Sequence, residues 1–271
     1  MLISIRHVTR YSYAQPVAYA IQSLRLTPAS FKGQRVIDWQ IDMPGFGPPM
    51  EFRDGFGNVV HLATASIAHS EVAIEAGGTV ETTDCSGVVT GLPKSAPPRV
   101  FLKETAQTLP DKAIRELAAS AKGKDTLDKL HALAEIVRNQ VDYQIGSTHA
   151  HTCAADALAD GKGVCQDHAH IFISAGRTLG VPVRYVTGYL ALAEPATSEA
   201  NHAWAEAWVD GLGWVGFDVA NRICPTDRYV RLAVGLDAGY AAPIIGSRRG
   251  GNAEQLDVAV EVREQEQNVH Q

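Results

Sequence analysis

The stretch Gly161-Lys-Gly-Val-Cys165-Gln-Asp-His-Ala-His170 decides the fold of this chain. Two glycines deliver a single cysteine to the start of an apolar-rich run, which predicts a helix from Cys165 to Leu179. A helix N-terminus carries about half a positive charge and unpaired N–H groups. Such a site lowers a cysteine pKa from about 8.5 towards roughly 3.5–7.5, and its N–H groups can face an oxyanion. We therefore predict that Cys165 is a nucleophile.

Two partners for this cysteine follow along the chain. The run Asn201-His-Ala-Trp-Ala-Glu-Ala-Trp-Val209 alternates with a period of two, which predicts a strand that opens on His202. A turn follows, and the second strand, Trp214 to Asp218, ends on an acid. A cysteine, a histidine and an acid, with the cysteine at a helix N-terminus, are the groups that an activated thiol nucleophile needs.

The length of the loop between these two strands decides whether the acid can reach the histidine. Side chains alternate between the two faces of a sheet, so a two-residue turn at Gly211-Leu212 would point Asp218 away from His202. A three-residue loop, Asp210 to Leu212, places both side chains on one face as diagonal neighbours. We therefore predict an odd-length loop or a bulge, a hydrogen bond from His202 to Asp218, and Cys165 on the other side of the imidazole.

The rest of the sequence predicts an α+β protein. Residues 1–90 show alternating strand patterns without helix signals, which is typical of an antiparallel β domain, and a Pro-rich linker occupies residues 91–98. Residues 99–245 form the predicted catalytic core. Residues 246–271 begin with a predicted loop, Gly246 to Gly251, and continue with an alternating strand that we expect to return to the N-terminal domain.

Helix signals begin only after the linker. Asp111 and Asp125 are predicted N-caps of two helices, and Thr152 is the predicted cap of a short helix that ends near Leu158.

Several segments resemble one family. GVCQDHAH (163–170), NHAWAEAW (201–208) and GWVGFD (213–218) are similar to the bacterial transglutaminase-like proteins of the papain-like cysteine fold. HVTRYSYAQPV (7–17) and LRLTP (24–28) resemble the family's N-terminal β domain, and CPTDRYVRLAVGLD (224–237) resembles its tail. The resemblance implies that Cys165 is the nucleophile, His202 the base and Asp218 the orienting acid of a transglutaminase-like α+β core.

Three further residues are candidates for the substrate groove or the oxyanion site. Tyr143 falls where the resembling enzymes place an aromatic side chain, and it could supply a second oxyanion donor beside the Cys165 N–H. Gln166 lies in the first turn of the predicted helix. Trp204 shares a face with His202 and is the best candidate for a groove wall, although packing in the hairpin core is the simpler explanation for all tryptophans there.

A metal site is a weaker alternative. The residues that could form one are His149, His151, Cys153, His168 and His170. The sequence contains neither CxxC nor HExxH, and His168 and His170 are too close in sequence to share one helical face. No acidic calcium loop of the EF-hand type is present. We therefore expect no metal and no other cofactor.

The composition argues against several classes of function. The chain has 271 residues, 45% of them hydrophobic, and a net charge of −6, which argues against general nucleic-acid binding. No apolar run is long enough for a membrane span or a signal peptide, so we expect a cytoplasmic protein whose four cysteines stay reduced.

We expect an enzyme that transfers acyl groups through a thioester, with a peptide or protein as substrate. Hydrolysis and transamidation use the same triad, so both remain open, with hydrolysis favoured. The rival function is a non-catalytic binding or assembly module on the same fold. The oligomeric state is not predicted.

Overall fold

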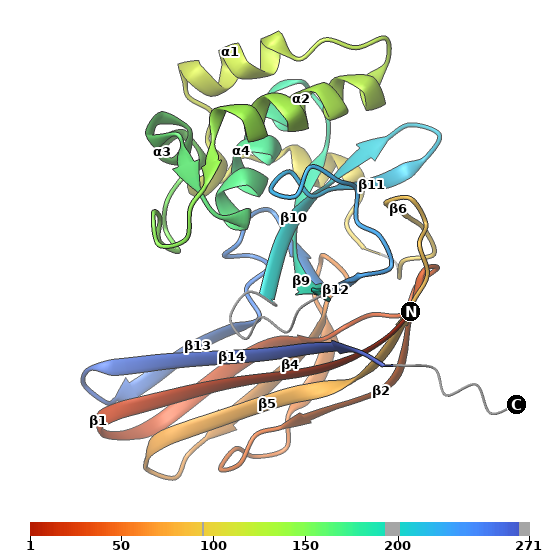
Figure 1. Ribbon diagram of the computed structural model, residues 1–271. Coiled ribbons are helices and arrows are strands. Elements are labelled where there is room, and N and C mark those ends of the chain that lie inside the picture. Colours follow the sequence, from red (N-terminus) through yellow and green to blue (C-terminus); the bar gives the residue numbers. More distant parts are fainter. Residues whose placement is uncertain (94, 193–200, 266–271) are drawn as a thin grey trace, which may run out of the picture.

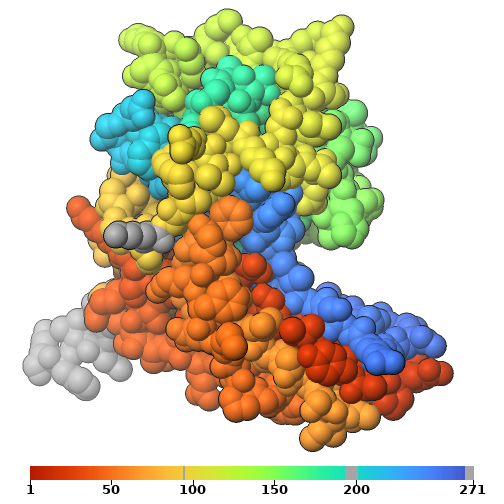
Figure 2. All heavy atoms as spheres, turned by 180° about the vertical axis from the view of Figure 1, so that it is seen from behind, coloured from red at the N-terminus to blue at the C-terminus, as the bar shows by residue number. Residues whose placement is uncertain are grey.

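The computed structural model describes residues 1–93, 95–192 and 201–265. Figure 1 shows a β domain, built largely from the N-terminal residues, with the blue C-terminal hairpin lying along it. A mixed layer of helices and strands stands on this β domain. The back view in Figure 2 shows the red and orange N-terminal part in direct contact with the yellow and blue segments of the core. The architecture is therefore α+β, as predicted.

One very long strand organises the β domain. The first half of β1 lies between β5 and β14, and its second half lies between β4 and β13. The register with β5 shifts between Ser12 and Val17, around Pro16, which has no N–H to donate to a ladder. β2 extends the sheet beyond β5, and β3 extends it beyond β4. The strands are β1 (Leu2–Thr27), β2 (Gln34–Asp42), β3 (Met50–Arg53), β4 (Val59–Ala65), β5 (His69–Thr82), β13 (Ile244–Gly250) and β14 (Glu254–Glu264).

The C-terminal segment returns to the β domain, as its alternating pattern predicted. β14 pairs antiparallel with β1 from Ile3 opposite Glu264 to Tyr13 opposite Glu254. The prediction of a loop at Gly246 to Gly251 was wrong, because most of this stretch belongs to β13. Its glycines and arginines have low strand propensity, but pairing with the second half of β1 supplies the hydrogen bonds that hold it extended.

The core has one sheet in the order β12-β9-β10-β11-β6, with helices packed on one face. Its strands are β6 (Val88–Val89), β9 (Val183–Leu190), β10 (Asn201–Val209), β11 (Gly213–Phe217) and β12 (Tyr229–Gly235). The helices are α1 (Lys112–Ser120), α2 (Thr126–Gln140), α3 (Ala154–Asp160) and α4 (Cys165–Thr178), with short 3-10 turns η1 (Pro98–Leu102) and η2 (Ala106–Thr108). Two short strands, β7 (Asp142–Tyr143) and β8 (Lys162–Gly163), form a parallel pair beside α4. None of the helices in the described ranges could cross a bilayer.

Two of the predicted helix caps are confirmed. The Asp111 carboxylate accepts a hydrogen bond from the N–H of Ile114 at 2.8 Å, and Asp125 caps α2 in the same way. The third prediction was wrong by one residue. The N-cap of α3 is Cys153, and the Thr152 hydroxyl instead accepts from the N–H of His149 at 3.1 Å.

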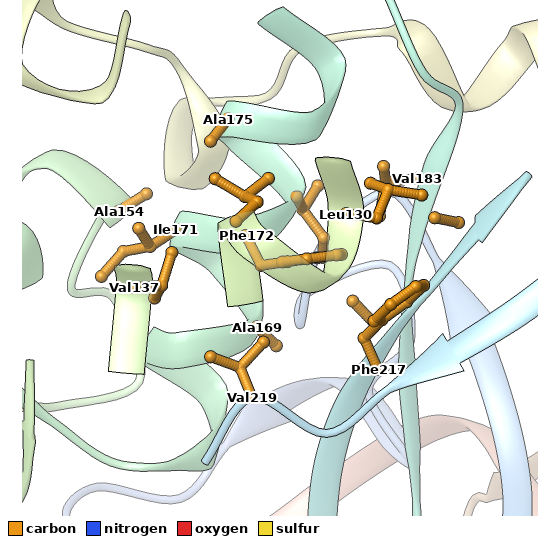
Figure 3. Packing of buried hydrophobic residues seen from close by; sticks show 14 of the residues in the cluster. Leu130, Val137, Ala154, Ala169, Ile171, Phe172, Ala175, Val183, Phe217 and Val219 are labelled. Atoms are coloured by element: carbon orange, nitrogen blue, oxygen red, sulfur yellow. The ribbon is translucent and has the colours of Figure 1, made fainter. Parts of the chain in front are cut away.

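The helix that carries the cysteine is the centre of the core. Residues 167–177 of α4 are buried, because α1, α2, α3 and the sheet all pack against it. Figure 3 shows Ile171 and Phe172 of α4 enclosed by side chains from these neighbours, among them Leu130 of α2 and Phe217 of β11. Burial of each such side chain contributes about 1.5–3 kcal/mol, so the position of the helix is strongly fixed.

Two side chains of the N-terminal domain form hydrogen bonds with β12, the edge strand of the core sheet. The Gln34 side chain donates to the carbonyl oxygen of Arg231 at 2.9 Å and accepts from its N–H at 2.7 Å. Asn58 makes the same two bonds to Val234, both at 2.8 Å. The backbone groups of both β12 residues therefore have hydrogen-bond partners on the side away from β9, where no strand of the described residues pairs. The two buried side-chain amides thus form the hydrogen bonds that a neighbouring strand would otherwise form.

Candidate active site

Cys165 is the first residue of α4, as predicted, and the turn before it is tightly held. The Asp167 carboxylate accepts from the N–H of Val164 at 2.8 Å and from the Thr148 hydroxyl at 2.6 Å. Asp167 is buried, and a Cβ at Gly163 would lie only 2.6 Å from its Cβ. Glycine is therefore required there, and the loop delivers the half-buried Cys165 thiol to a helix N-terminus, where backbone N–H groups have no partner within the helix.

His202 and Asp218 form the predicted pair. The Nε2 atom of the histidine donates to Oδ2 of the aspartate at 2.6 Å, and both side chains are buried. The register that permits this contact is the predicted one. Val209 pairs with Gly213, which leaves a three-residue loop, and Gly211 within that loop has a φ of 86°. The parity argument from the sequence is confirmed.

Two residues that the sequence analysis did not single out hold the carboxylate. The Asn221 side chain donates to Asp218 at 2.7 Å, and the Tyr229 hydroxyl donates to it at 2.7 Å. Burial by itself would raise the pKa of Asp218, but the hydrogen bond and charge of His202, together with these two donors, outweigh burial and lower that pKa. Asn221 could have been predicted, because it follows Asp218 by three residues in a turn and its side chain can therefore reach the carboxylate. Tyr229 lies in the tail segment quoted above but carried no local signal.

The imidazole lies between the acid and the thiol. Burial would lower the pKa of His202, but its hydrogen bonds to Asp218 and Cys165 outweigh burial and raise the pKa to about 10. Because Nε2 is bonded to the aspartate, Nδ1 is the ring nitrogen that remains to exchange a proton with the thiol. The three predicted triad residues are thus brought together in one chain of contacts.

Trp204 supports the histidine from inside the protein. Its ring lies 6.3 Å from the imidazole ring at an interplanar angle of 25°, and it packs edge to face against Tyr229. It is only 2% exposed, so the prediction that it forms a wall of the substrate groove was wrong. The other hairpin tryptophans, Trp208 and Trp214, pack against each other. Core packing, the simpler explanation, accounts for all three.

The surface is hollowed on both sides of Cys165. One hollow of about 460 Å³ has Val164 on its wall, and the other, of about 330 Å³, has Gln166. Asn201 borders both hollows, and the two together are called the groove below. The first is lined by Arg138, Tyr143, Ile145, Val164, Leu190, Leu192, Asn201, His202, Ala220 and Asn221. A groove of this kind can hold an extended chain with its carbonyl over the thiol.

The two remaining candidates lie on opposite sides of the cysteine. Tyr143 lines the first hollow, is 38% exposed and stacks on His168. Gln166 lines the second hollow, and its side-chain amide donates to the carbonyl oxygen of Ala150 at 3.3 Å. Both therefore border the groove that crosses the site.

The histidine and cysteine cluster is not assembled as a metal site. Both ring nitrogens of His168 lie within hydrogen-bond distance of backbone carbonyls, of Val164 and Val141. His170 accepts a hydrogen bond from a backbone N–H at 3.1 Å, and burial lowers its pKa to about 4. Within residues 1–93, 95–192 and 201–265, no three potential ligands converge on one point.

Comparison with known proteins agrees with this geometry. A sequence model of the transglutaminase-like superfamily matches residues 115–219, and a model of the bacterial transglutaminase-like N-terminal region matches residues 3–81. An uncharacterized protein of Mycobacterium leprae (strain TN) is 32% identical over 270 residues, which cover 94% of this chain and 96% of that protein. An uncharacterized protein of Mycobacterium tuberculosis (strain ATCC 25618 / H37Rv) is 27% identical over 287 residues, with 95% and 91% covered.

A solved structure shares the fold along the full chain. A candidate cysteine protease from Cytophaga hutchinsonii superposes with a TM-score of 0.73 at 23% identity, and the match covers 97% of this chain and 98% of that one. The two matched sequence models cover the β domain and the segment that carries Cys165, His202 and Asp218. The chain therefore belongs to the bacterial transglutaminase-like family, a family of cysteine-dependent enzymes with a papain-like core.

Proposed function

We propose that this protein is an acyl-transfer enzyme that cleaves amide bonds of peptides or proteins through a thioacyl-enzyme on Cys165. The single observation that carries the proposal is the 2.6 Å hydrogen bond between His202 and the buried Asp218, with the Cys165 thiol near enough to the imidazole to help raise its pKa. A thiol with an imidazole partner, at a helix N-terminus and on a groove, is the arrangement that nucleophilic catalysis requires.

The first step forms the acyl-enzyme. At neutral pH the His202 imidazole, whose pKa is raised to about 10, holds a proton and pairs with the Cys165 thiolate, which attacks the substrate carbonyl carbon. The resulting oxyanion is stabilised by the Cys165 N–H and by a second donor, for which Tyr143 on the groove wall is the candidate; each donor is worth about 3 kcal/mol of barrier. The imidazolium then protonates the leaving amine, and the carbon–nitrogen bond breaks to leave a thioester.

Asp218 orients the imidazole and stabilises its protonated form. Three residues donate to the carboxylate: His202, Tyr229 and Asn221, the last from both its backbone N–H and its side chain. A carboxylate so held keeps its negative charge, and the charge favours the imidazolium that forms when the thiol loses its proton.

Water is the favoured acceptor in the second step. An alkylamine acceptor is a cation at neutral pH, and carboxylates are absent from the described residues that line either hollow. None of these described lining residues is thus an ion-pair partner that would concentrate a protonated amine near the thioester. In hydrolysis the imidazole takes a proton from the attacking water, the thiolate leaves, and the thiolate–imidazolium pair is restored.

The test is acylation by an activated ester. Mixing the protein with p-nitrophenyl acetate should release a burst of nitrophenolate equal to the enzyme concentration and place one acetyl group on Cys165 in a peptide map. Cys165→Ala should show no burst. Added glycine methyl ester should divert little of the acetyl group into amide product. Acetylation spread evenly over all cysteines would refute the proposal, and diversion of most acetyl groups to the amine would reassign the reaction to transamidation.

A further inference from the structure

Besides His202, the described wall of the groove carries one cationic side chain, in a protein with a net charge of −6. Arg138 of α2 lines the hollow that His202 also lines. In the described part of the chain, neither this hollow nor the one on the other side of Cys165 is lined by an aspartate or glutamate. None of the described residues that line the two hollows therefore neutralises the charge of this guanidinium with a carboxylate.

The guanidinium is held in place by backbone groups. Its Nε donates to the carbonyl oxygen of Ala220 at 3.1 Å, and its Nη1 donates to the carbonyl oxygen of Val141 at 3.1 Å. Arginine has five N–H donors, so the two bonds leave three N–H groups for another acceptor. A fixed guanidinium loses little side-chain entropy when it binds a carboxylate, which it can do with two parallel hydrogen bonds.

The nearest acid on the same helix already has a different partner. Glu135 accepts from Arg222 at 2.7 Å, and Arg222 also donates to Asn139. Among the described residues, Arg138 forms no ion pair. Two arginines thus lie at this end of the core, one paired on the surface and one facing the groove.

Arg138 is coupled to the triad by a short path. Its hydrogen bond to Ala220 joins it to the turn in which the next residue, Asn221, holds the Asp218 carboxylate. The guanidinium is therefore fixed relative to His202. A group bound to it would occupy the same hollow as an acyl substrate.

We propose that Arg138 is a substrate-binding residue that recognises a carboxylate on the acyl donor. The proposal rests on the proposed function, because it names the chemistry of the substrate for the same groove. Beside Arg138 the hollow presents the exposed side chains of Ile145 and Leu192. The substrate is thus a peptide segment that combines an acidic group with apolar side chains.

The experiment compares two alkylating reagents that differ mainly in charge. Iodoacetate carries a carboxylate and iodoacetamide does not, and the rate constant for labelling Cys165 is measured with each. In Arg138→Gln the iodoacetate to iodoacetamide ratio should fall about threefold to tenfold relative to wild type, as expected for loss of one nearby unit charge at low salt. Arg138→Lys should keep most of the ratio, which separates loss of charge from misfolding.

Arg222→Gln is the matched control, because it removes a cation from the same end of the core without changing the groove wall. Its ratio should stay at the wild-type value. An unchanged ratio in Arg138→Gln, or an equal fall in Arg222→Gln, would overturn the proposal while leaving the nucleophile assignment intact. Failure of both reagents to label Cys165 in the wild type would overturn the proposed function and this inference with it.

The carboxylate could belong to a side chain or to a chain end, and three small ligands distinguish the two. N-acetylglutamic acid α-amide carries only a side-chain carboxylate, and N-acetylglutamine carries only a chain-end carboxylate. N-acetylglutamine amide carries no carboxylate. At least one of the two acids should slow iodoacetamide labelling of Cys165 more than the neutral amide, and Arg138→Gln should abolish the difference. Equal protection by all three ligands in the wild type would contradict the proposal.

Discussion

The side-chain amides of Gln34 and Asn58, which hydrogen-bond to β12, predict that the N-terminal domain stabilises the core sheet. In Gln34→Ala, a backbone N–H and a carbonyl of Arg231 lose their partners in a buried setting. In Asn58→Ala the same happens at Val234. Each unpaired buried group costs about 1–3 kcal/mol, and each substitution leaves two such groups. Water that enters the site offsets part of this cost, so each substitution should lower the free energy of unfolding by about 2–4 kcal/mol.

The assay is urea unfolding followed by tryptophan fluorescence, since Trp204 and Trp214 lie in the core sheet. The double variant should lose less than the sum of the two single losses, because both amides cap one strand and the first loss already loosens it. Gln40→Ala, an exposed position on the same strand as Gln34, is the control and should change stability by less than about 0.5 kcal/mol.

The same variants should weaken the site itself. β12 carries Tyr229, whose hydroxyl holds the Asp218 carboxylate at 2.7 Å. If β12 loosens, labelling of Cys165 by iodoacetamide should slow, although Gln34 and Asn58 belong to the other domain. A double variant that loses less than about 1 kcal/mol and keeps the wild-type labelling rate would refute the idea that the N-terminal domain supports catalysis.

Three further predictions concern buried polar groups. Tyr229→Phe removes one donor from Asp218 and should slow Cys165 labelling by up to about tenfold, whereas an unchanged rate would show that Asn221 alone suffices. Glu206→Gln leaves Arg184 and Arg231 buried without their carboxylate and should cost about 3–5 kcal/mol in urea unfolding, while Glu75→Gln, in an exposed pair, should change little. Burial lowers the pKa of His7 to about 4, below its unfolded value of about 6.5, so its stabilising effect is complete above pH 6.5 and is lost as pH falls from 6.5 to 4, by about 3 kcal/mol. His7→Gln should make unfolding correspondingly less acid-sensitive, and an unaltered pH profile would contradict this.

The sequence predicted best those features that depend on residues close together in the chain. Strand alternation allowed Asp218 to reach His202 only across an odd-length loop, and the observed register has that loop. The N-caps Asp111 and Asp125 are local signals of the same kind, because the capping side chain and the N–H that it binds lie three residues apart.

Tertiary contacts decided the features that the sequence did not reveal. The segment that begins Gly246-Ser247 is extended because β1, more than two hundred residues earlier in the chain, pairs with it. Trp204 alternates like a groove residue but is covered by Tyr229 from β12. Such contacts join segments that lie far apart in the chain. Propensity and periodicity describe only neighbouring residues, so they could not predict these contacts.

Competition among the four cysteines tests the central claim most directly. All four thiols are free and half-buried, so Cys85, Cys153 and Cys224 are internal standards for Cys165. Burial raises the pKa of the Cys224 thiol, and burial together with a hydrogen bond to Asp156 raises that of Cys153. Both should react slowly at neutral pH.

The measurement is the rate of iodoacetamide labelling of each cysteine at pH 6.5, read by peptide mapping. Cys165 should be labelled at least about tenfold faster than the others, since a thiolate is the reacting species. His202→Ala and, to a smaller extent, Asp218→Asn should remove that advantage. Equal rates at all four cysteines, or a Cys165 rate that His202→Ala leaves unchanged, would contradict the assignment of Cys165 as an activated nucleophile.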